Sequence, residues 1–491
     1  MNTIEVFKTA PYPHQQMAFD LFKDKSYFAL FTDMGTGKTK MLLDIAAYKY
    51  NKKEIDCMVI LAPKQVVPNW TFIEIEKHLG IPHTVAQFRN PMKVKEKEQI
   101  FNLYLSKKDI GLRILTMNID AARCKDGFKC LTNFLAKFRC FLVIDESTSI
   151  KNPSASVTKN LLKLSRKAWT KAISTGYPAP QSCLDYYSQM EFLREGLSGF
   201  KSFFFYKCFY AITKKIRVKQ QVREDEDKPK GSGREVTIVT GFKNQEKLTD
   251  LLDSFALRIK KEECLDLPEK IDIPQIIELT TEQKKVYVEV AKRCMSELAE
   301  DQEITVTSAI TKIMKLHQVA CGHVKLDNGD WIDLPNNRLE TLKSIVEELP
   351  DEKIIIWAHY KKDIENIHKM LGESSVTFYG DTVDTQASLA AFHNDPKIRY
   401  IIINPKSGMS GITLVESSLN IYYSYSYNLE HWLQSRDRTH RIGQKNNVRY
   451  ILFYCKGTVE EKILSALREK KQLSDEILNN ITNYIKEGMK I

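Results

Sequence analysis

Short apolar runs rich in β-branched residues recur through the first part of the chain, separated by longer segments of mixed polarity. The runs are YFALFT (27–32), CMVILAP (57–63), LRILTM (112–117), FLVIDE (141–146) and KAISTG (171–176). Continuous apolar runs with helix-length spacers are typical of buried parallel strands joined by helical crossovers. The pattern predicts an N-terminal α/β domain, which we place at residues 1–195.

A second series of the same kind begins near residue 350. Its runs are IIIWAH (354–359), RYIIINP (399–405), LNIYYS (419–424) and RYILFY (449–454). We therefore predict a second α/β domain at residues 276–457. After it, Thr458 to Glu461 forms a T-x-x-E capping box, and apolar residues recur at helical spacing, so we predict a helical tail at residues 458–491.

The interval 196–275 differs from both domains. It begins with the aromatic stretch KSFFFYKCFYA (201–211) and continues with KQQVREDEDKPKGSGRE (219–235), which is too polar to pack. We predict a helical insertion or linker that carries an exposed charged loop. We interpret the aromatic stretch as core packing of a helical protrusion, with a docking surface for a protein partner as the alternative.

Composition limits the classes of function. Lys and Arg (73) exceed Asp and Glu (62) by 11, which suits a polyanionic partner. The ten cysteines form no C-x-x-C pair, so we predict free thiols and no zinc site. No apolar run approaches ~18 residues and the N-terminus lacks the apolar core of a signal peptide, so we expect neither membrane insertion nor export but an intracellular setting.

The stretch TDMGTGKT (32–39) has the context of a phosphate-binding loop. It follows the first apolar run, and Met41, Leu42, Ile45 and Ala46 give the apolar spacing of a helix after it. Glycines let backbone N–H groups approach phosphates, the lysine reaches the outer phosphates, and the threonine holds Mg²⁺. Thr32 stands where the motif usually has glycine. The predicted nucleotide-binding residues of the loop are Gly35, Thr36, Gly37, Lys38 and Thr39. The alternative is a glycine turn before an ordinary helix.

Two acids end the fourth apolar run, FLVIDES. A strand that ends in this way places Asp145 beside a metal ion and Glu146 where it orients the attacking water. Taken alone, the same acids would more often be a solvated strand end. Together with the phosphate loop they predict a Mg²⁺-dependent nucleoside-triphosphatase core, which kinases, transporters and switches also share.

A third stretch, WLQSRDRTHRIGQKNNV (432–448), lies in the second predicted domain. Its Gln434, Arg438 and Arg441 recur at spacings of four and three, so we predict that they share one helix face and direct two guanidinium groups at a phosphate. A basic, solvated helix is the alternative.

This stretch resembles motif VI of the Swi/Snf-type ATPases of helicase superfamily two, and other stretches match in the family's order. They are PHQQMAF, DMGTGKT, VILAPKQVVPNW, DESTSIKNPSA, STGYPAPQS, LRIKKEECLDLPEK (257–270), NPKSGMSGITL (404–414) and KGTVEEKI (456–463). The resemblance runs from about residue 12 to 470. It implies two RecA-like parallel-sheet lobes.

The resemblance also implies roles for single residues. Gln15 would recognise the adenine base. Lys38 and Thr39 would bind the phosphates and Mg²⁺, and Asp145 and Glu146 would hold the metal ion and orient the water. Arg438 and Arg441 would be arginine fingers. Gly411 would contribute to the nucleotide site. The residues in the places where the family holds a nucleic-acid backbone, without reading its sequence, are Pro63, Lys64, Asn69, Trp70, Ser407 and Gly408.

Four residues depart from the family's pattern. Thr148 stands where His is frequent, which puts the usual link between motifs II and III in doubt. Tyr177 replaces a threonine, Ser424 replaces an acid, and Leu429 replaces a proline. None of the four is a predicted hydrolytic group, so we still expect activity.

The resemblance implies an ATP-driven translocase on double-stranded DNA. One alternative is a helicase that separates the strands of DNA or RNA, and Tyr422, Tyr423, Tyr425 and Tyr427 are the reason to consider it, although we interpret them as a buried strand end. Another is a partner-bound remodeller that displaces RNA polymerase or another DNA-bound protein. Without a recognisable reader domain, the chain resembles bacterial and bacteriophage members, which implies the cytoplasm, or the nucleus in a eukaryote.

Overall fold

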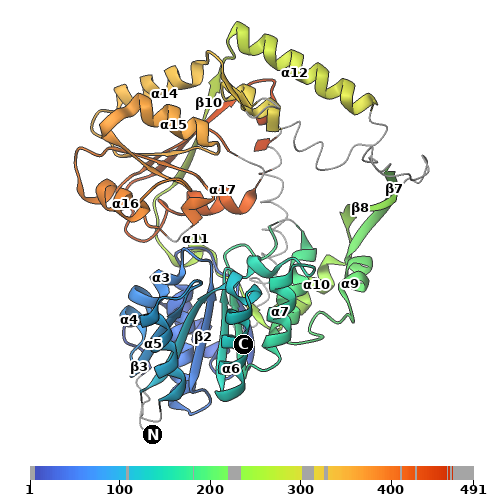
Figure 1. Cartoon of the computed structure of the whole chain (residues 1–491), viewed down its shortest axis with the longest axis vertical. Helices are drawn as coiled ribbons and strands as arrows, with labels where there is room; N and C mark the ends of the chain where they lie inside the picture. The colour runs from blue at the N-terminus through green and yellow to red at the C-terminus, as the bar shows by residue number, and fades with distance from the viewer. Residues whose placement is uncertain are drawn as a thin grey trace. The chain divides into compact units, whose positions relative to one another are not determined.

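The computed structural model consists of two compact units (Figure 1). The described residues of the first unit lie within 1–211 and 242–266, and those of the second within 212–241 and 267–469. The structure describes residues 6–106, 110–180, 182–218, 234–300, 314–325, 330–409, 412–425, 428–461, 463–464 and 467.

The first unit is built on a seven-stranded sheet in the order β3-β4-β2-β5-β6-β1-β9, with every neighbouring pair parallel. The strands are β1 (Tyr27–Leu30), β2 (Cys57–Ala62), β3 (His83–Phe88), β4 (Leu112–Asn118), β5 (Cys140–Asp145), β6 (Thr170–Ser174) and β9 (Ala256–Leu257). The five predicted strands are confirmed. The prediction missed β3 and β9, because β3 is half polar and only half of its residues are fully buried at the edge of the sheet, and β9 has only two residues.

Helices cover both faces of this sheet. Along β2, Val59 and Leu61 belong to one apolar core and Met58 and Ile60 to the other, as expected when successive side chains point to opposite faces. The helices of the unit are α1 (Pro13–Phe22), α2 (Lys38–Asn51), α3 (Val67–Asn69), α4 (Ile75–His78), α5 (Val94–Leu105), α6 (Lys125–Lys137), α7 (Ser156–Ser165), α8 (Tyr186–Leu193), α9 (Phe203–Tyr210), α10 (Gln245–Asp253) and α11 (Lys261–Cys264). Burial on both faces explains why its strands are continuous apolar runs.

The second unit holds a six-stranded parallel sheet in the order β10-β17-β16-β13-β15-β14. Its strands are β10 (Lys270–Ile277), β13 (Ile354–Trp357), β14 (Ser375–Phe378), β15 (Tyr400–Ile403), β16 (Leu419–Tyr422) and β17 (Val448–Cys455). Its helices include α12 (Thr281–Glu300), α14 (Asn337–Glu348), α15 (Lys361–Leu371), α16 (Thr385–Asn394) and α17 (Leu429–Arg436), and a hairpin pairs β11 (His323–Lys325) with β12 (Trp331–Asp333). The four predicted strands are confirmed, and with them the prediction of two α/β lobes.

The interval 196–275, predicted as a helical insertion, contains strands as well as helices. Besides α9, α10 and α11 it includes a two-stranded sheet of β7 (Ala211–Val218) and β8 (Arg234–Phe242), and it supplies β9 to the first sheet and β10 to the second. Residues 219–233, most of the predicted charged loop, lie outside the described residues.

The aromatic stretch divides between core and surface. On α9, Tyr206 and Tyr210 are buried in the first unit's core, whereas Phe204 and Phe205 are 68% and 56% exposed. Core packing, the preferred interpretation, therefore accounts for the tyrosines and leaves the two phenylalanines on the surface.

The predicted tail begins as a helix. Residues 459–461 are helical, and the Thr458 hydroxyl accepts the Glu460 N–H at 3.3 Å, as an N-cap does. Val459, Ile463 and Leu467 are buried. The remaining tail residues, 468–491, lie outside the described residues.

Among the residues that the structure describes, none of the helices combines the length and apolar character needed to span a bilayer.

Candidate ATPase site

The predicted phosphate loop connects β1 to α2. Gly35 and Gly37 have φ angles of +84° and +87°, a left-handed conformation that glycine adopts without strain. A Cβ atom at Gly37 would lie 2.2 Å from Nε2 of Gln15, so a larger residue would displace this side chain in addition to being strained at the positive φ angle. The loop therefore has the glycines at the two positions that its backbone requires.

Lys38 turns back onto the loop. Its Nζ donates to the carbonyl oxygens of Thr32 at 2.8 Å and of Asp33 at 3.2 Å. The Thr36 hydroxyl lies 2.9 Å from the Thr32 hydroxyl and 2.8 Å from the Asp33 carbonyl oxygen. Thr32, the residue in the usual glycine position, is buried and ties the loop together through its hydroxyl. Sequence reasoning missed this role.

Helix α1 supports the loop from the side. Nε2 of Gln15 donates to the Thr36 carbonyl oxygen at 3.2 Å, and Nε2 of His14 lies 2.8 Å from the same oxygen. Oε1 of Gln15 accepts the Tyr12 N–H at 3.1 Å. Gln15, the predicted adenine reader, is buried against the loop, and the sequence did not single out His14.

The two acids lie at the carboxyl end of β5. Glu146 has a φ angle of +57°, a conformation that costs a non-glycine residue energy and is concentrated at functional sites. Asp145 Oδ1 accepts the Ser174 hydroxyl at 2.8 Å and the Glu146 N–H at 3.2 Å, and Oδ2 accepts the indole N–H of Trp70 at 2.8 Å. Oε2 of Glu146 accepts the Thr175 hydroxyl at 3.0 Å.

The sheet brings these groups to one edge. Strands β5, β6 and β1 are neighbours and parallel, so their carboxyl ends lie at the same edge of the sheet. The two acids lie at the end of β5, the two hydroxyls at the end of β6, and the phosphate loop after β1. Ligands of open parallel sheets bind at this edge. Because Thr148 replaces the frequent His, the usual link between motifs II and III was in doubt. Here the motif III residues Ser174 and Thr175 bond directly to the motif II acids, Ser174 to Asp145 and Thr175 to Glu146.

The LRIKKEEC segment abuts the same loop. The Asp33 N–H donates to the Ile259 carbonyl oxygen at 3.0 Å, and Oδ2 of Asp33 accepts the Lys261 N–H at 3.0 Å. The short strand β9 pairs with β1 just before these residues. The segment that resembles the family's junction is therefore attached to the phosphate loop.

The residues predicted to hold nucleic acid in the first unit do not all face solvent. Lys64 is exposed, and Pro63 and Asn69 are partly exposed, with Nδ2 of Asn69 donating to Glu74 at 3.2 Å. The side chain of Trp70 is 1% exposed and its indole N–H is bonded to Asp145. In this structure the Trp70 ring therefore packs in the core, and its predicted nucleic-acid contact stays a prediction.

Of the three predicted motif VI residues in the second unit, only Gln434 lies in helix α17, which ends at Arg436. The prediction that Gln434, Arg438 and Arg441 share one helix face is wrong. Beyond the end of the helix, the Thr439 hydroxyl accepts the side-chain N–H of Asn420 on β16 at 3.1 Å.

The two arginines follow in the turn. Arg438 is buried, and its carbonyl oxygen accepts the Leu414 N–H at 3.0 Å. Nη1 of Arg441 donates to the Thr413 hydroxyl at 2.9 Å, and this side chain is partly exposed. Both arginines thus lie against residues 413–414 at the end of the motif V stretch.

The other predicted residues of that stretch differ in placement. Ser407 is partly exposed. Gly408 is buried, its N–H donates to the Asn404 carbonyl oxygen at 2.9 Å, and a Cβ atom there would lie 2.7 Å from the ring of Trp357. In this structure Gly408 therefore packs against Trp357, and its predicted contact with a nucleic acid stays a prediction. Gly411 lies outside the described residues.

Two departures from the family's pattern have local explanations. The Ser424 hydroxyl donates to Oδ2 of the buried Asp363 at 2.5 Å, and Oδ1 of Asp363 lies 2.7 Å from Nε2 of His323. An acid at position 424 would place two carboxylates in contact. Leu429 begins α17 without the usual proline, because Oδ1 of Asn428 caps the helix by accepting the His431 N–H at 3.1 Å.

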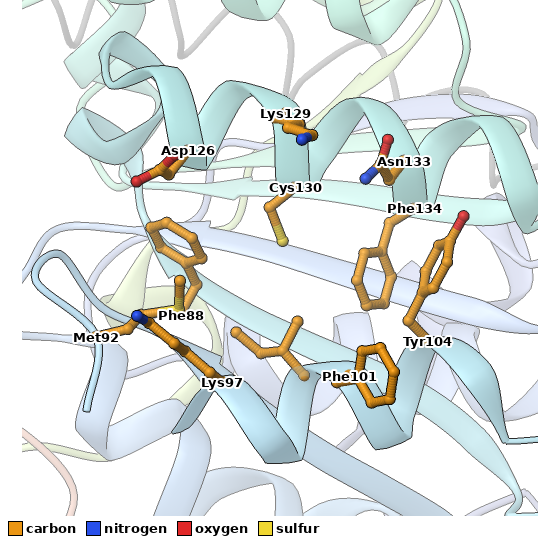
Figure 2. Close-up of a pocket in the computed structure, with 11 residues that line it drawn as sticks. Phe88, Met92, Lys97, Phe101, Tyr104, Asp126, Lys129, Cys130, Asn133 and Phe134 are labelled. Atoms are coloured by element: carbon orange, nitrogen blue, oxygen red, sulfur yellow. The ribbon is translucent and has the colours of Figure 1, made fainter. Parts of the chain in front are cut away.

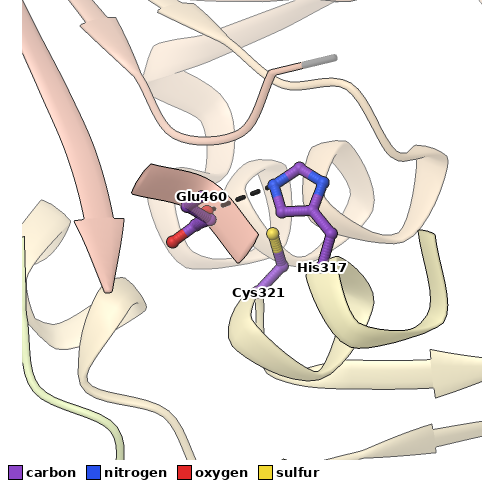
Figure 3. Close-up of side chains that lie close together, drawn as sticks. All are labelled: His317, Cys321 and Glu460. Atoms are coloured by element: carbon purple, nitrogen blue, oxygen red, sulfur yellow. Dashed lines mark hydrogen bonds and ion pairs between the residues drawn. The ribbon is translucent and has the colours of Figure 1, made fainter. Parts of the chain in front are cut away.

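A buried cluster in the second unit, shown in Figure 3, has the chemistry of metal ligands. His317, Cys321 and Glu460 offer ligand atoms within 4.8 Å of one another. Glu460 is already engaged: Oε2 accepts Arg338 at 2.6 Å and the Cys455 N–H at 2.7 Å, and Oε1 lies 3.1 Å from Nε2 of His317. Because the Arg338 guanidinium supplies the positive charge, we interpret the cluster as an ion-pair network.

A separate pocket of about 410 Å³ lies between α5 and α6 in the first unit (Figure 2). Its lining is mainly apolar and aromatic and includes Phe88, Phe101, Tyr104 and Phe134, with Lys97 and Lys129 beside them. It includes none of the predicted ATP-site residues of this unit.

The phosphate loop, the two acids and the parallel sheets define a P-loop nucleoside-triphosphate hydrolase. The chain belongs to the family of the SNF2-related domain, whose model matches residues 24–326, and the model of the Helicase conserved C-terminal domain matches residues 337–443. It is a Swi/Snf-type ATPase core and uses ATP.

Relatives are distant and longer. The chain is 24% identical over 531 residues to the TATA-binding protein-associated factor BTAF1 of Arabidopsis thaliana, covering 93% of this chain and 24% of that protein. It is 25% identical over 477 residues to the protein named uncharacterized ATP-dependent helicase MG018 of Mycoplasma genitalium, covering 94% of this chain and 41% of that protein. The chain therefore spans less than half of the length of these curated relatives.

Among solved structures, the Sulfolobus solfataricus SWI2/SNF2 ATPase core in complex with dsDNA is 22% identical to the chain. The match covers 98% of this chain and 95% of the other, with a TM-score of 0.40.

Proposed function

We propose that this ATPase moves along double-stranded DNA without separating its strands. The observation that favours a duplex track over an unwinding activity is the burial of Tyr422, Tyr423 and Tyr425, each at most 2% exposed. These rings are the aromatic groups that would otherwise stack on unpaired bases. Tyr427 lies outside the described residues.

The donor chemistry of the site suits Mg²⁺ with ATP. Mg²⁺ prefers oxygen ligands, and the Thr39 hydroxyl and the Asp145 carboxylate are the residues that would hold it. The bound ion would neutralise charge on the phosphates. When ATP binds, Lys38 would break its hydrogen bonds with the carbonyl oxygens of Thr32 and Asp33 and bind the outer phosphates instead.

The remaining steps fall to Glu146 and the two arginines. Glu146 would orient the attacking water, and its bond with Thr175 fixes one carboxylate oxygen for that task. By resemblance, Arg438 and Arg441 would stabilise the charge that develops on the transferred phosphoryl group. Because arginine fingers act only when they reach the nucleotide, they make hydrolysis depend on conformation, and this dependence would couple ATP to movement.

We propose that the protein contacts the phosphates of the double-stranded DNA and none of its bases. Lys64, the exposed residue of the predicted contacts, and Pro63 and Asn69 beside it are the candidates in the first unit, and Ser407 is the candidate in the second. The excess of 11 positive charges supports a polyanionic partner. Binding should be indifferent to DNA sequence and should weaken as salt rises.

A second candidate function is displacement of a protein from DNA with the help of a docked partner. The exposed Phe204 and Phe205 on α9 favour it, because adjacent large apolar side chains on a surface are typical of interaction sites. A relative of the chain is named a TATA-binding protein-associated factor.

The test is ATP hydrolysis measured in parallel with no nucleic acid, double-stranded DNA, single-stranded DNA and RNA. The proposal predicts the greatest stimulation by the duplex, whatever its sequence. Equal or greater stimulation by single strands or RNA would contradict it. If all four rates are equal and low, an obligatory partner becomes the better explanation.

A further inference from the structure

We propose that Trp70 is a positioning residue for the carboxylate of Asp145, and that through it the 63–70 segment influences ATP hydrolysis. The first part concerns contacts within the first unit. The second part rests on the proposed function, because it assigns DNA contacts to this segment.

Three neutral donors fix the Asp145 carboxylate. The Trp70 indole holds Oδ2 at 2.8 Å, while the Ser174 hydroxyl and the Glu146 N–H hold Oδ1 at 2.8 and 3.2 Å. An ionised carboxylate accepts roughly four hydrogen bonds, so about one position remains for a further partner. The donors therefore determine the direction in which this acid presents its free lone pair.

Tryptophan suits this position for two reasons. Its N–H is neutral, so it orients the carboxylate without the charge by which a lysine or arginine would compete with a metal ion. Its ring is 1% exposed and packs in the core formed around β2, so it does not move independently of the segment that carries it. Donors that orient metal-binding groups typically change metal affinity or activity by about 10–100-fold when removed.

The segment around Trp70 links the surface to the site. Trp70 is the first residue of a π-helical stretch that ends at Glu74, and such stretches are frequent at functional sites. The next residue, Thr71, places its hydroxyl 2.7 Å from that of Thr116 on β4. Lys64 and Asn69 precede Trp70 in the same segment. A shift of these residues on binding a phosphate backbone would therefore move the indole, and with it the Asp145 carboxylate.

The first experiment needs no DNA. Trp70→Phe keeps an aromatic ring and removes the N–H donor. Binding of a fluorescent ADP analogue is titrated with Mg²⁺, and also measured in a chelator. We expect the Mg²⁺ concentration for half-saturation to rise by about 10–100-fold, with nucleotide affinity in the chelator unchanged.

Two control variants separate orientation from packing. Trp169→Phe makes the same chemical change at a position that is 62% exposed, and Thr71→Val removes a hydroxyl that bonds the Val67 carbonyl oxygen at 2.8 Å and the Thr116 hydroxyl at 2.7 Å. Both should keep the wild-type Mg²⁺ dependence. An unchanged dependence in Trp70→Phe, or an equal rise in Thr71→Val, would overturn the assignment.

If Trp70→Phe does not fold, the wild-type protein still provides a test. Its five tryptophans can be labelled as 5-fluorotryptophan and their fluorine resonances assigned by substituting each of the other four in turn. The Trp70 resonance should shift when Mg²⁺ is added to the ADP complex. A resonance that does not respond would refute the inference.

The link to DNA is tested by the ratio of duplex-stimulated to basal hydrolysis at saturating Mg²⁺. We expect this ratio to fall by at least about tenfold in Trp70→Phe and to stay unchanged in Trp169→Phe. Full stimulation in Trp70→Phe would refute the link. If duplex does not stimulate even the wild type, the proposed function fails, while the Mg²⁺ titration still decides the role of Trp70.

Discussion

Replacing Glu460 with glutamine should weaken the second unit strongly. Glu460 and Arg338 are both 0% exposed, and their charged atoms lie 2.6 Å apart. The substitution keeps the size of the side chain but leaves the Arg338 guanidinium buried without its counter-charge, a change that typically costs about 3–5 kcal/mol. The amide oxygen can keep the two bonds at the Oε2 position, from Arg338 and the Cys455 N–H, so the loss comes from the missing charge rather than from missing acceptors.

Hydrogen exchange of the backbone amides in β16 and β17 measures this loss locally. The cost of 3–5 kcal/mol corresponds to protection that falls by about 10²- to 10⁴-fold if the unit opens cooperatively. Glu461→Gln is the matched control, since Glu461 is exposed, and surface changes of this kind usually stay within about 0.5 kcal/mol.

The effect should also depend on pH. Burial by itself would raise the pKa of Glu460, but the charge of Arg338 and the bond with His317 outweigh it and hold the pKa below its usual value of 4.5. A lowered pKa means that the charged form stabilises the fold fully above pH 4.5 and that this stability is lost as pH falls through the folded pKa. The difference between wild type and Glu460→Gln should therefore shrink in acid. Equal protection in the two proteins at neutral pH would refute the network as a source of stability.

Two further predictions concern the nucleotide site. Lys38→Ala should abolish ATP binding, whereas Glu146→Gln should bind ATP and hydrolyse it very slowly, as nucleotide-binding and single-turnover assays would show; full turnover in Glu146→Gln would rule out its assigned role. Arg441→Ala, and to a similar degree Arg438→Ala, should lower duplex-stimulated hydrolysis by at least ~10³-fold with much smaller changes in nucleotide affinity, and retention of half the wild-type rate in both would place the fingers elsewhere.

The core strands could be predicted because both faces of each sheet are covered. Strands β2 and β5 are buried along their whole length, and so were visible as continuous apolar runs. Strands β3 and β14 lie at the edges of their sheets, where half of the side chains reach solvent and the pattern no longer differs from that of a loop.

Contacts distant in sequence explain what the prediction missed at the site. The spacing of Arg438 and Arg441 suggests a helix face, but the helix ends at Arg436, and Thr439 beyond it bonds Asn420 on β16. Local sequence cannot show that bond. Trp70 similarly bonds an acid 75 residues away, and Ser424 bonds one 61 residues away. Residue types and order indicated the chemistry of the site, whereas these pairings needed the fold.

The most direct test of the proposed function is removal of a third DNA strand from a triplex, measured beside unwinding of a forked duplex with one enzyme preparation. A motor that follows the duplex should displace the third strand when ATP is supplied and leave the duplex beneath intact. The fork should stay paired. Efficient unwinding of the fork with no displacement from the triplex would contradict translocation on double-stranded DNA and favour a strand-separating helicase.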